Sequence, residues 1–326
     1  MPEQPAPKVS IVVPVYNTSQ YLRECLNSLL AQKLREIEVV CVDDGSTDSS
    51  PAILEEYAAR DGRIRVISKP NGGYGHTMNR GFEAARGEYV GIVESDDFAD
   101  PRMFRDLYRF AKRHDCDLVK ANYYEHSESG DVKQEPFARY RYKRVFDPRI
   151  EQDVITQLPI IWSALYRRDL IRANGIRFNE TPGASYQDTS FVQQVWMAAR
   201  RVALLPKGYL HYRVDNSSSS VKSSAKVFAV CDEYEASERF MREDPERVVA
   251  FAPLLNLLKL GTYRWNFNRI AGEHRRGFAE RMAQEYAAAR AASELDESYF
   301  SPEDWAMLCL LMEDMDGFMA RYGEGL

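Results

Sequence analysis

Residues 9–17 are Val-Ser-Ile-Val-Val-Pro-Val-Tyr-Asn, and residues 37–48 are Ile-Glu-Val-Val-Cys-Val-Asp-Asp-Gly-Ser-Thr-Asp. Nearly continuous runs of β-branched residues are typical of strands buried on both faces of a parallel sheet. Each run ends in polar residues and leads into a segment with helical periodicity, starting at Ser19 after the first run and at Ser50-Pro51 after the second. The two stretches therefore predict consecutive strand–helix units.

The same alternation continues along the chain, with strands expected at 64–67 and 89–93 and a helix at 77–85 between them. Repeated alternation of this kind predicts a doubly wound α/β sheet. Further on, we expect a helix at 188–199 and a strand at 202–205. The polar, aromatic and basic stretch 123–146 is either an edge hairpin or a mobile loop. Beyond residue 222 the pattern favours helices alone.

Composition narrows the class of protein. The 326 residues include 43 Lys and Arg against 49 Asp and Glu, a net charge of −6, which disfavours a nucleic-acid binder. The five cysteines form no CxxC pair, so neither a zinc site nor a disulfide framework is indicated, and a reducing cytosol fits. No signal peptide is apparent, and no apolar run approaches the ~18 residues of a membrane span. We expect a soluble, cytoplasmic protein, or one held peripherally at the inner face of a membrane.

Acidic residues gather where three of the expected strands end. The first strand runs into Tyr16-Asn17, the second into Asp43-Asp44-Gly45-Ser46, and the fourth into Glu94-Ser95-Asp96-Asp97. Ligands of doubly wound sheets bind at the carboxyl ends of the strands, so five carboxylates converge there. Helix capping explains one acid per loop and not adjacent acids. Because clustered carboxylates repel one another, the pattern predicts a hard divalent cation, Mn²⁺ or Mg²⁺.

These motifs, in this order, resemble the inverting nucleotide-sugar glycosyltransferases of family 2, of the bacterial surface-polysaccharide type. The matching segments are residues 9–17, 42–48, 71–75, 79–81, 85–89 and 95–97. The resemblance implies the GT-A fold, a Rossmann-like, doubly wound mixed sheet, here with a C-terminal helical extension. It also implies a metal-dependent, hexose-transferring enzyme that moves a sugar from a UDP-linked donor to a hydroxyl of a saccharide or lipid-linked acceptor in polysaccharide synthesis.

The resemblance assigns roles to individual residues. Pro14, Tyr16 and Asn17 would line the base pocket, with Asp43 accepting from uracil and Asp44 near the ribose. The Asn71-Gly72-Gly73 loop, Glu94 and Ser95 would also face the donor, and Arg213 would clamp the diphosphate. The metal ligands would be Asp96, Asp97 and His211. The general base would be Asp188, which we expect a helix N-terminus to keep ionised.

Two positions depart from the family pattern. Glu94 stands where the family's metal motif begins with Asp, and Gln187 stands where a Glu precedes the base. These departures keep open the alternative of a non-catalytic nucleotide-sugar-binding scaffold or sensor. A phosphoryl-group transferase on the same fold is a further alternative. Asp188 itself could be only a helix cap.

We expect four parts in the chain: a disordered tail (1–7), a glycosyltransferase domain (8–222) with a nucleotide-binding half (8–100) and an acceptor and catalytic half (101–222), and a helical region (223–326). The Ser-rich segment 217–224 would be a lid over the donor. The basic stretch 139–146 is either a solvated hairpin or a patch for a lipid diphosphate near a membrane. In one last helix, a stripe from Trp305 to Tyr322 would pack in the core, and a second apolar side with Met307, Leu311 and Phe318 could pair two subunits as a homodimer.

Overall fold

A computed structural model describes residues 6–216 and 226–326. The expected lid (217–224) and most of the expected tail (1–7) therefore lie outside the described residues. The chain divides into two compact units, Met1–Ser219 and Ser220–Leu326.

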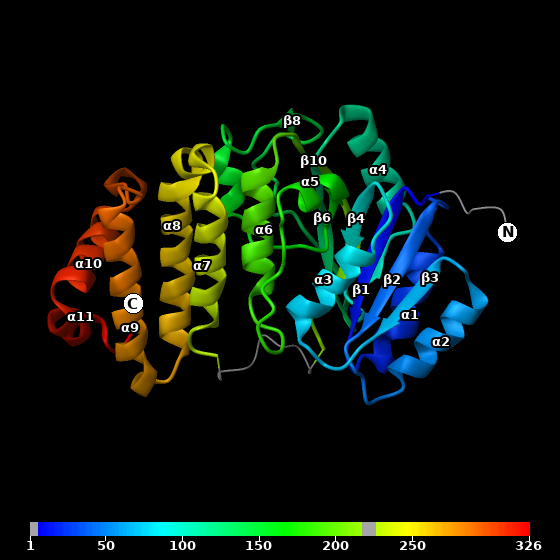
Figure 1. The fold of residues 1–326 in the computed structure, drawn as a ribbon, viewed down its shortest axis with the longest axis horizontal. Coiled ribbons are helices and arrows are strands. Elements are labelled where there is room, and N and C mark those ends of the chain that lie inside the picture. Colours follow the sequence, from blue (N-terminus) through cyan, green and yellow to red (C-terminus); the bar gives the residue numbers. More distant parts are fainter. Residues whose placement is uncertain (1–5, 217–225) are drawn as a thin grey trace. The chain divides into compact units, whose positions relative to one another are not determined.

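The first unit is built on one ten-stranded sheet with the order β3-β2-β1-β4-β9-β6-β10-β5, with β7 beside β6 and β8 beside β10 (Figure 1). Strands β1 to β4 run parallel, whereas β9 lies antiparallel between β4 and β6. The expected doubly wound, mixed α/β sheet is thus confirmed. The strands are β1 (Val9–Val15), β2 (Ile37–Asp43), β3 (Ile64–Ser68), β4 (Tyr89–Ile92), β5 (Phe98–Ala99), β6 (Leu118–Ser127), β7 (Gly130–Gln134), β8 (Val145–Phe146), β9 (Ala164–Arg167) and β10 (Val202–Arg213).

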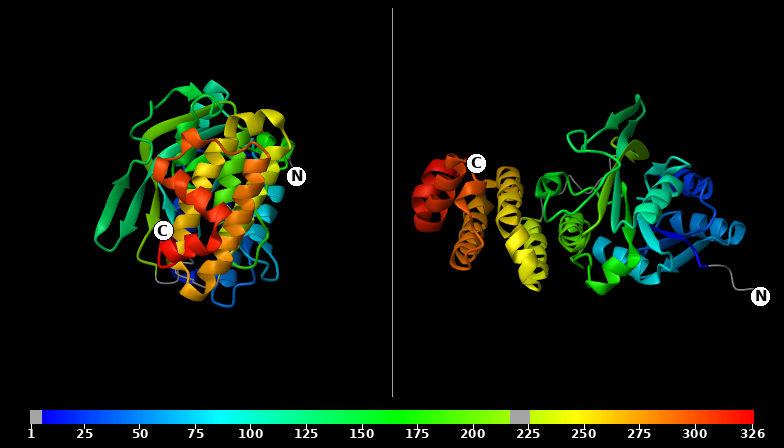
Figure 2. Two further views of the ribbon diagram at one scale, coloured as in Figure 1. Left: turned by 90° about the vertical axis from the view of Figure 1, so that its left-hand side faces the viewer. Right: turned by 90° about the horizontal axis from the view of Figure 1, so that it is seen from above.

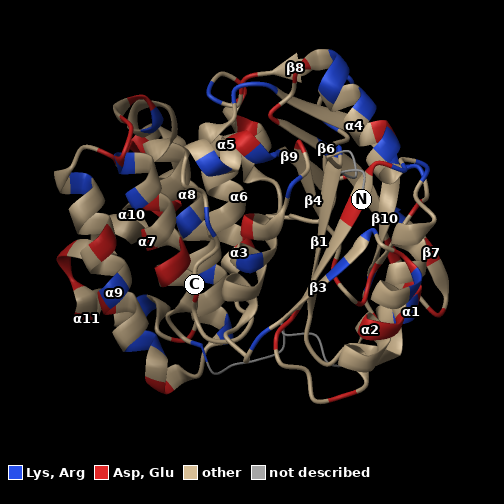
Figure 3. Ribbon diagram, turned by 45° about the vertical axis from the view of Figure 1, so that its right-hand side comes forward, with Lys and Arg blue, Asp and Glu red and all other residues tan. Residues whose placement is uncertain are grey.

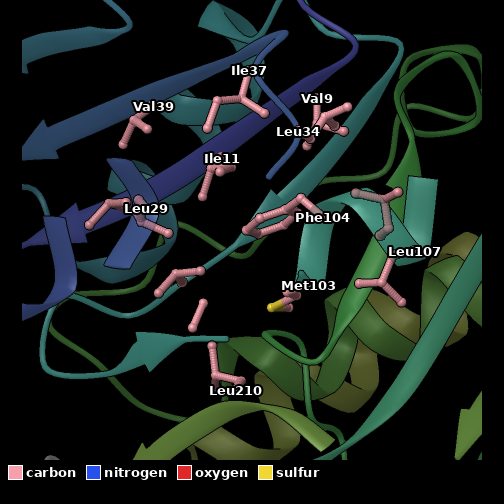
Figure 4. Close-up of a cluster of buried hydrophobic side chains, with 14 of the residues drawn as sticks. Val9, Ile11, Leu29, Leu34, Ile37, Val39, Met103, Phe104, Leu107 and Leu210 are labelled. Atoms are coloured by element: carbon pink, nitrogen blue, oxygen red, sulfur yellow. The ribbon is translucent and has the colours of Figure 1, made fainter. Parts of the chain in front are cut away.

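Six α-helices of the first unit accompany this sheet among the described residues: α1 (Ser19–Leu30), α2 (Ser50–Arg60), α3 (Tyr74–Ala84), α4 (Met103–His114), α5 (Arg168–Ala173) and α6 (Gln187–Ala198). Helix α3 begins three residues before the expected start at Thr77, directly after Gly73, and β10 extends eight residues beyond the expected end at Leu205. Figure 4 shows side chains of β1 and β2 meeting those of α1 and α4 in the core. Leu29, Phe104 and Leu107 are fully buried there, and burying each such side chain stabilises the fold by about 1.5–3 kcal/mol.

The stretch 123–146 is partly a hairpin, as one of the two interpretations expected. Strands β6 and β7 form it, and Figure 2 shows it extending away from the body of the first unit. Two of the basic side chains that follow it are held by intramolecular contacts: Arg139 bonds to Thr156 Oγ1 at 3.1 Å, and Arg144 pairs with Glu151. Figure 3 shows further basic residues along α4.

The second unit is helical, as expected, with α7 (Ala229–Arg242), α8 (Pro245–Arg269), α9 (Gly272–Ala291), α10 (Pro302–Glu313) and α11 (Met315–Tyr322). The expectation of one last helix is wrong, because Asp314 interrupts it and caps α11 by accepting from the Gly317 N–H. Met307, Leu311 and Phe318, expected on a surplus face, are buried. No helix within 6–216 or 226–326 combines the length and apolarity needed to cross a bilayer.

One carboxylate fixes the start of two helices. Asp48 accepts from the N–H of Ser19, where α1 begins, and from the N–H of Ser50, where α2 begins, both at 2.9 Å. Burial alone would raise the pKa of Asp48, but these hydrogen bonds outweigh it and lower the pKa to about 2. Asp48 therefore ties together the loops that follow β1 and β2.

We predict that Asp48→Ala lowers the free energy of unfolding by about 1–2 kcal/mol, the upper part of the range for lost helix caps, because two helices lose a partner. Urea denaturation at pH 7 measures this. Glu55→Ala, which removes an exposed acid from α2, should change stability far less. Because the pKa of Asp48 is depressed, the difference in stability between the wild type and Asp48→Ala should vanish as the pH falls toward 2. Equal stabilities of the two variants at pH 7 would contradict the role.

Candidate active site

The carboxyl ends of β1, β2 and β4 bring the predicted donor-site residues to one edge of the sheet. β1 pairs with β2 on one side and with β4 on the other. Side chains also join the loops: Thr18 Oγ1 donates to Ser95 Oγ at 2.9 Å, and the Asn17 N–H donates to Ser46 Oγ at 3.0 Å. The three loops therefore form one connected surface.

The residues expected to line a base pocket divide into two kinds. Tyr16 is half exposed at the end of β1, whereas Pro14 is buried within the strand. The side-chain oxygen of Asn17 accepts from the Thr47 N–H at 2.7 Å and from the Asp48 N–H at 3.3 Å. Asn17 thus braces the loop after β2, although it too is exposed, and the Tyr16 ring lies exposed beside it.

The two aspartates after β2 play different parts. Asp44 accepts from the backbone N–H of Gly72 at 2.8 Å and of Gly73 at 3.0 Å, and it pairs with the Lys69 ammonium. Both its oxygens are therefore engaged within the protein. Asp43 accepts from the Ser46 N–H at 3.1 Å through Oδ1, and its Oδ2 makes no hydrogen bond to the described residues. Sequence reasoning missed Lys69, although it follows the end of β3 at the same sheet edge.

The loop after β4 carries three crowded carboxylates. Glu94 accepts a hydrogen bond from Tyr74 Oη at 2.6 Å. Burial, with the charges of Asp96 and Asp188, raises the pKa of Glu94 to about 8. Asp96 accepts from Asn216 Nδ2 at 2.8 Å, and Asp97 accepts from the Arg213 N–H at 2.9 Å through Oδ1.

The second carboxylate oxygen of Asp97 is the atom that indicates a possible metal site. Oδ2 is buried and has no hydrogen-bond partner among the described residues. Burial and the neighbouring charge of Asp96 also raise the pKa of Asp97 well above its ordinary value. A buried carboxylate oxygen without a donor fits a hard cation, which prefers oxygen ligands. Asp96 and Asp97 are therefore suited to hold Mn²⁺ or Mg²⁺.

His211 does not join this carboxylate set, contrary to expectation. Its Nδ1 lies 2.9 Å from Asp131 Oδ2, and its ring is stacked between the rings of Phe98 and Tyr124. The reason is strand register: His211 pairs with Phe98 on β5 and with Tyr124 on β6. The potential metal ligands grouped around it are His126 and Asp131.

Arg213 was expected to clamp a diphosphate. In the structure it is hydrogen-bonded to the loop after β4. Its Nε donates to the Asp96 carbonyl at 3.0 Å, and Nη2 donates to Glu24 Oε2 at 2.6 Å. The guanidinium also lies over the Tyr21 ring, 4.6 Å from its centroid. Arg213 thus positions Asp96 and Asp97 with both its backbone and its side chain, and its contact with a phosphate remains a prediction.

Asp188 lies in the first turn of α6, close enough to Tyr74, Tyr166 and Glu94 for its charge to raise the pKa of each. A helix N-terminus was expected to keep it ionised, and two opposing influences set its pKa. Nearby backbone N–H groups lower its pKa, but burial outweighs them and raises the pKa to about 6. At pH 7 the carboxylate is still mainly ionised and is a better proton acceptor than an ordinary Asp.

The departure at Gln187 has a structural role. Its side chain donates to Thr181 Oγ1 at 2.8 Å and accepts from the Ser185 N–H at 2.5 Å. It therefore braces the loop 181–185 that leads into α6. A glutamate carboxylate could not donate the hydrogen bond to Thr181 Oγ1. This contact with the loop therefore explains why Gln stands at position 187.

The same loop packs directly on the Asn71–Gly73 loop. The Tyr74 N–H donates to the Gly183 carbonyl at 3.0 Å. Gly73 has a φ of +85°, and a Cβ there would lie 2.8 Å from the Gly183 nitrogen and 2.9 Å from the Thr181 carbonyl oxygen. Glycine at 73 thus lets the segment carrying Asp188 approach the donor loops.

A doubly wound mixed sheet with this carboxylate-rich edge defines a GT-A glycosyltransferase. Residues 10–175 match the family model described as glycosyl transferase family 2, and the chain belongs to that family. The chain is 34% identical over 249 residues to EpsH of Bacillus subtilis, a match that covers 73% of this chain and 70% of EpsH. It is also 35% identical over 223 residues to EpsJ of B. subtilis, a match that covers 65% of this chain and 62% of the length of EpsJ.

A solved structure shares the fold over nearly the whole chain. Staphylococcus aureus TarS 1–349 in complex with UDP-GlcNAc is similar with a TM-score of 0.78 and 25% identity, covering 97% of this chain and 90% of that one.

We predict that Gly73→Ala destabilises the protein by about 1–3 kcal/mol, the range for a residue forced into a disfavoured backbone region, because the new Cβ meets backbone that cannot move independently. Gly62→Ala is the matched control, since its Cβ would meet nothing within 4 Å and its φ is not positive. That variant should be neutral or slightly more stable. Thermal or urea unfolding compares the two, and equal effects would disprove the close approach at Gly73.

Proposed function

We propose that the protein is a metal-dependent, inverting glycosyltransferase that moves a sugar from a UDP-linked donor to a hydroxyl of a saccharide acceptor in polysaccharide synthesis. The observation that carries this proposal is Asp188. It is a carboxylate with a pKa of about 6, placed beside the donor loops, near Glu94 and Tyr74. Five free cysteines, four of them buried, support a cytoplasmic location.

The donor would lie along the edge formed by β1, β2 and β4. Uracil would stack on the half-exposed Tyr16 ring, and Asp43 Oδ2 would accept from its ring N–H. The Asn71–Gly73 loop, held by Asp44, presents backbone close to the nucleotide. A divalent cation held by Asp96 and Asp97 would supply charge stabilisation for the departing nucleoside diphosphate.

The acceptor would enter from the side of Asp188. The aspartate takes the proton of the attacking hydroxyl while the oxygen forms a bond to the anomeric carbon. The bond from that carbon to the diphosphate oxygen breaks, and the nucleoside diphosphate leaves with the electron pair. Attack in line with the leaving group inverts the configuration, and one base suffices for this single displacement.

Aromatic side chains next to the carboxylates support a saccharide acceptor. Trp162 stacks on Tyr212 with ring centroids 5.1 Å apart, and Tyr123 meets Trp162 edge-on at 4.7 Å. Burial and then the charge of Asp97 raise the pKa of Tyr212 to about 12, so this aromatic group adjoins the loop after β4. Aromatic walls with a few polar groups are typical of small-ligand sites.

We predict that Asp188→Asn lowers kcat by ~10²–10⁴-fold, the contribution of general acid–base catalysis, because an amide cannot accept the proton. In the wild type, kcat should rise tenfold per pH unit below about 6 and level off above it, since the base works only when deprotonated. The variant should lose this dependence. Initial rates of product formation from a UDP-sugar, measured between pH 5 and 8, test both expectations.

Calorimetric donor affinity should stay the same in Asp188→Asn, because the nucleotide contacts lie on the other loops. Asp169→Asn, an exposed acid in the first turn of α5, is the control and should transfer at the wild-type rate. Equal transfer by wild type and Asp188→Asn would reduce Asp188 to a helix cap. Donor binding without any transfer by the wild type would favour the scaffold alternative.

A further inference from the structure

A second group of potential metal ligands lies on the hairpin of β6 and β7 and on β10. His126 Nδ1 is 2.7 Å from Asp131 Oδ1, and His211 Nδ1 is 2.9 Å from Asp131 Oδ2. One nitrogen from each imidazole and one carboxylate oxygen lie within 4.8 Å of one another. Strand pairing produces this arrangement, because His126 faces Asp131 across the hairpin and β10 runs beside β6.

The ring of His211 is held firmly. It is stacked against Phe98 at a centroid distance of 4.4 Å and against Tyr124 at 4.9 Å, while His126 meets Phe98 edge-on at 4.9 Å. Despite its short distance to Asp131, His211 Nδ1 does not meet the geometry of a hydrogen bond, and it is buried without a hydrogen-bond partner among the described residues. A fixed, buried nitrogen whose lone pair lacks a donor is suited to a cation.

The chemistry of the three ligands selects the kind of cation. Imidazole nitrogen suits zinc and neighbouring transition metals, whereas Mg²⁺ and Ca²⁺ prefer oxygen. Three protein ligands leave zinc an open fourth position for water or another ligand. Asp131 faces both imidazoles with its carboxylate, Oδ1 toward His126 and Oδ2 toward His211.

We propose that His126, Asp131 and His211 bind one divalent transition-metal cation of the zinc or cobalt type, at a site separate from the Asp96–Asp97 carboxylates. The cation would clamp the β6–β7 hairpin to β10 immediately before Tyr212 and Arg213. Because the Arg213 N–H bonds to Asp97, the clamp would hold the strand end that positions the donor-site carboxylates. The proposal does not depend on the identity of the donor.

The test uses the full chain, stripped of metal by a chelator and without nucleotide. Titration with Zn²⁺ is followed by calorimetry, and titration with Co²⁺ by its visible absorption, which changes when protein ligands replace water and alter the coordination geometry. We expect one site in the wild type. His126→Ala and the isosteric Asp131→Asn should each weaken it by at least tenfold, the lower end of what even outer-shell partners cost.

Two controls separate this site from others. His274→Ala removes a histidine that also lies beside a carboxylate, Glu273 at 3.5 Å, but has no second histidine, and it should bind Zn²⁺ like the wild type. Asp96→Asn should also retain the nucleotide-free site. Circular dichroism verifies that each variant is folded. The proposal is overturned if the wild type shows no nucleotide-free Zn²⁺ or Co²⁺ site, if folded Asp131→Asn binds equally well, or if Asp96→Asn abolishes the binding.

Discussion

Carboxylates that share one edge of a sheet repel one another, and the site is organised by the groups that offset this repulsion. Asp44 is neutralised by Lys69 and by the backbone N–H groups of a glycine loop, and Asp48 by the first N–H groups of two helices. Within the described parts of the chain, the Tyr74 hydroxyl is the one side-chain donor to the Glu94 carboxylate, and one oxygen of Asp97 has no donor. The acids that shape the loops are thus satisfied within the protein, whereas Asp97 keeps one buried oxygen without a donor from the described residues.

The fold of residues 8–100 could be predicted closely from the sequence, for a physical reason. β1 and β2 are buried along their whole length, so their residues form continuous apolar runs that stand out from the surrounding sequence. Their polar ends mark the loops, and the parallel order brings those loops together. Asp43, Asp96 and Asp97 could therefore be placed at one edge before their contacts were known. The sequence could not show which acid would be fully hydrogen-bonded within the protein, because the partners of Asp44 come from the separate loop 69–73.

The second half was less predictable, because its strands are short and their partners are distant. β9 has four residues and lies between β4 and β6 in the antiparallel direction. The local sequence pattern predicts neither this position nor this direction. His211 was assigned to the wrong partners for the same reason, since only the register of β10 against β5 and β6 reveals Phe98, Tyr124 and Asp131 around it. The break at Asp314 was missed because the apolar stripe continues through it. In each case a long-range pairing or a single cap overrides the local periodicity.

The proposed function depends most on a cation that Asp96 and Asp97 would hold and that would help to bind a uridine nucleotide. The most direct measurement is the calorimetric affinity for UDP, with and without Mn²⁺, in the wild type and in Asp96→Asn. The account predicts that Mn²⁺ strengthens UDP binding in the wild type and has no such effect in the variant, because an amide cannot supply the anionic ligand. Equal strengthening by Mn²⁺ in both proteins, or no effect of Mn²⁺ on the wild type, would contradict it.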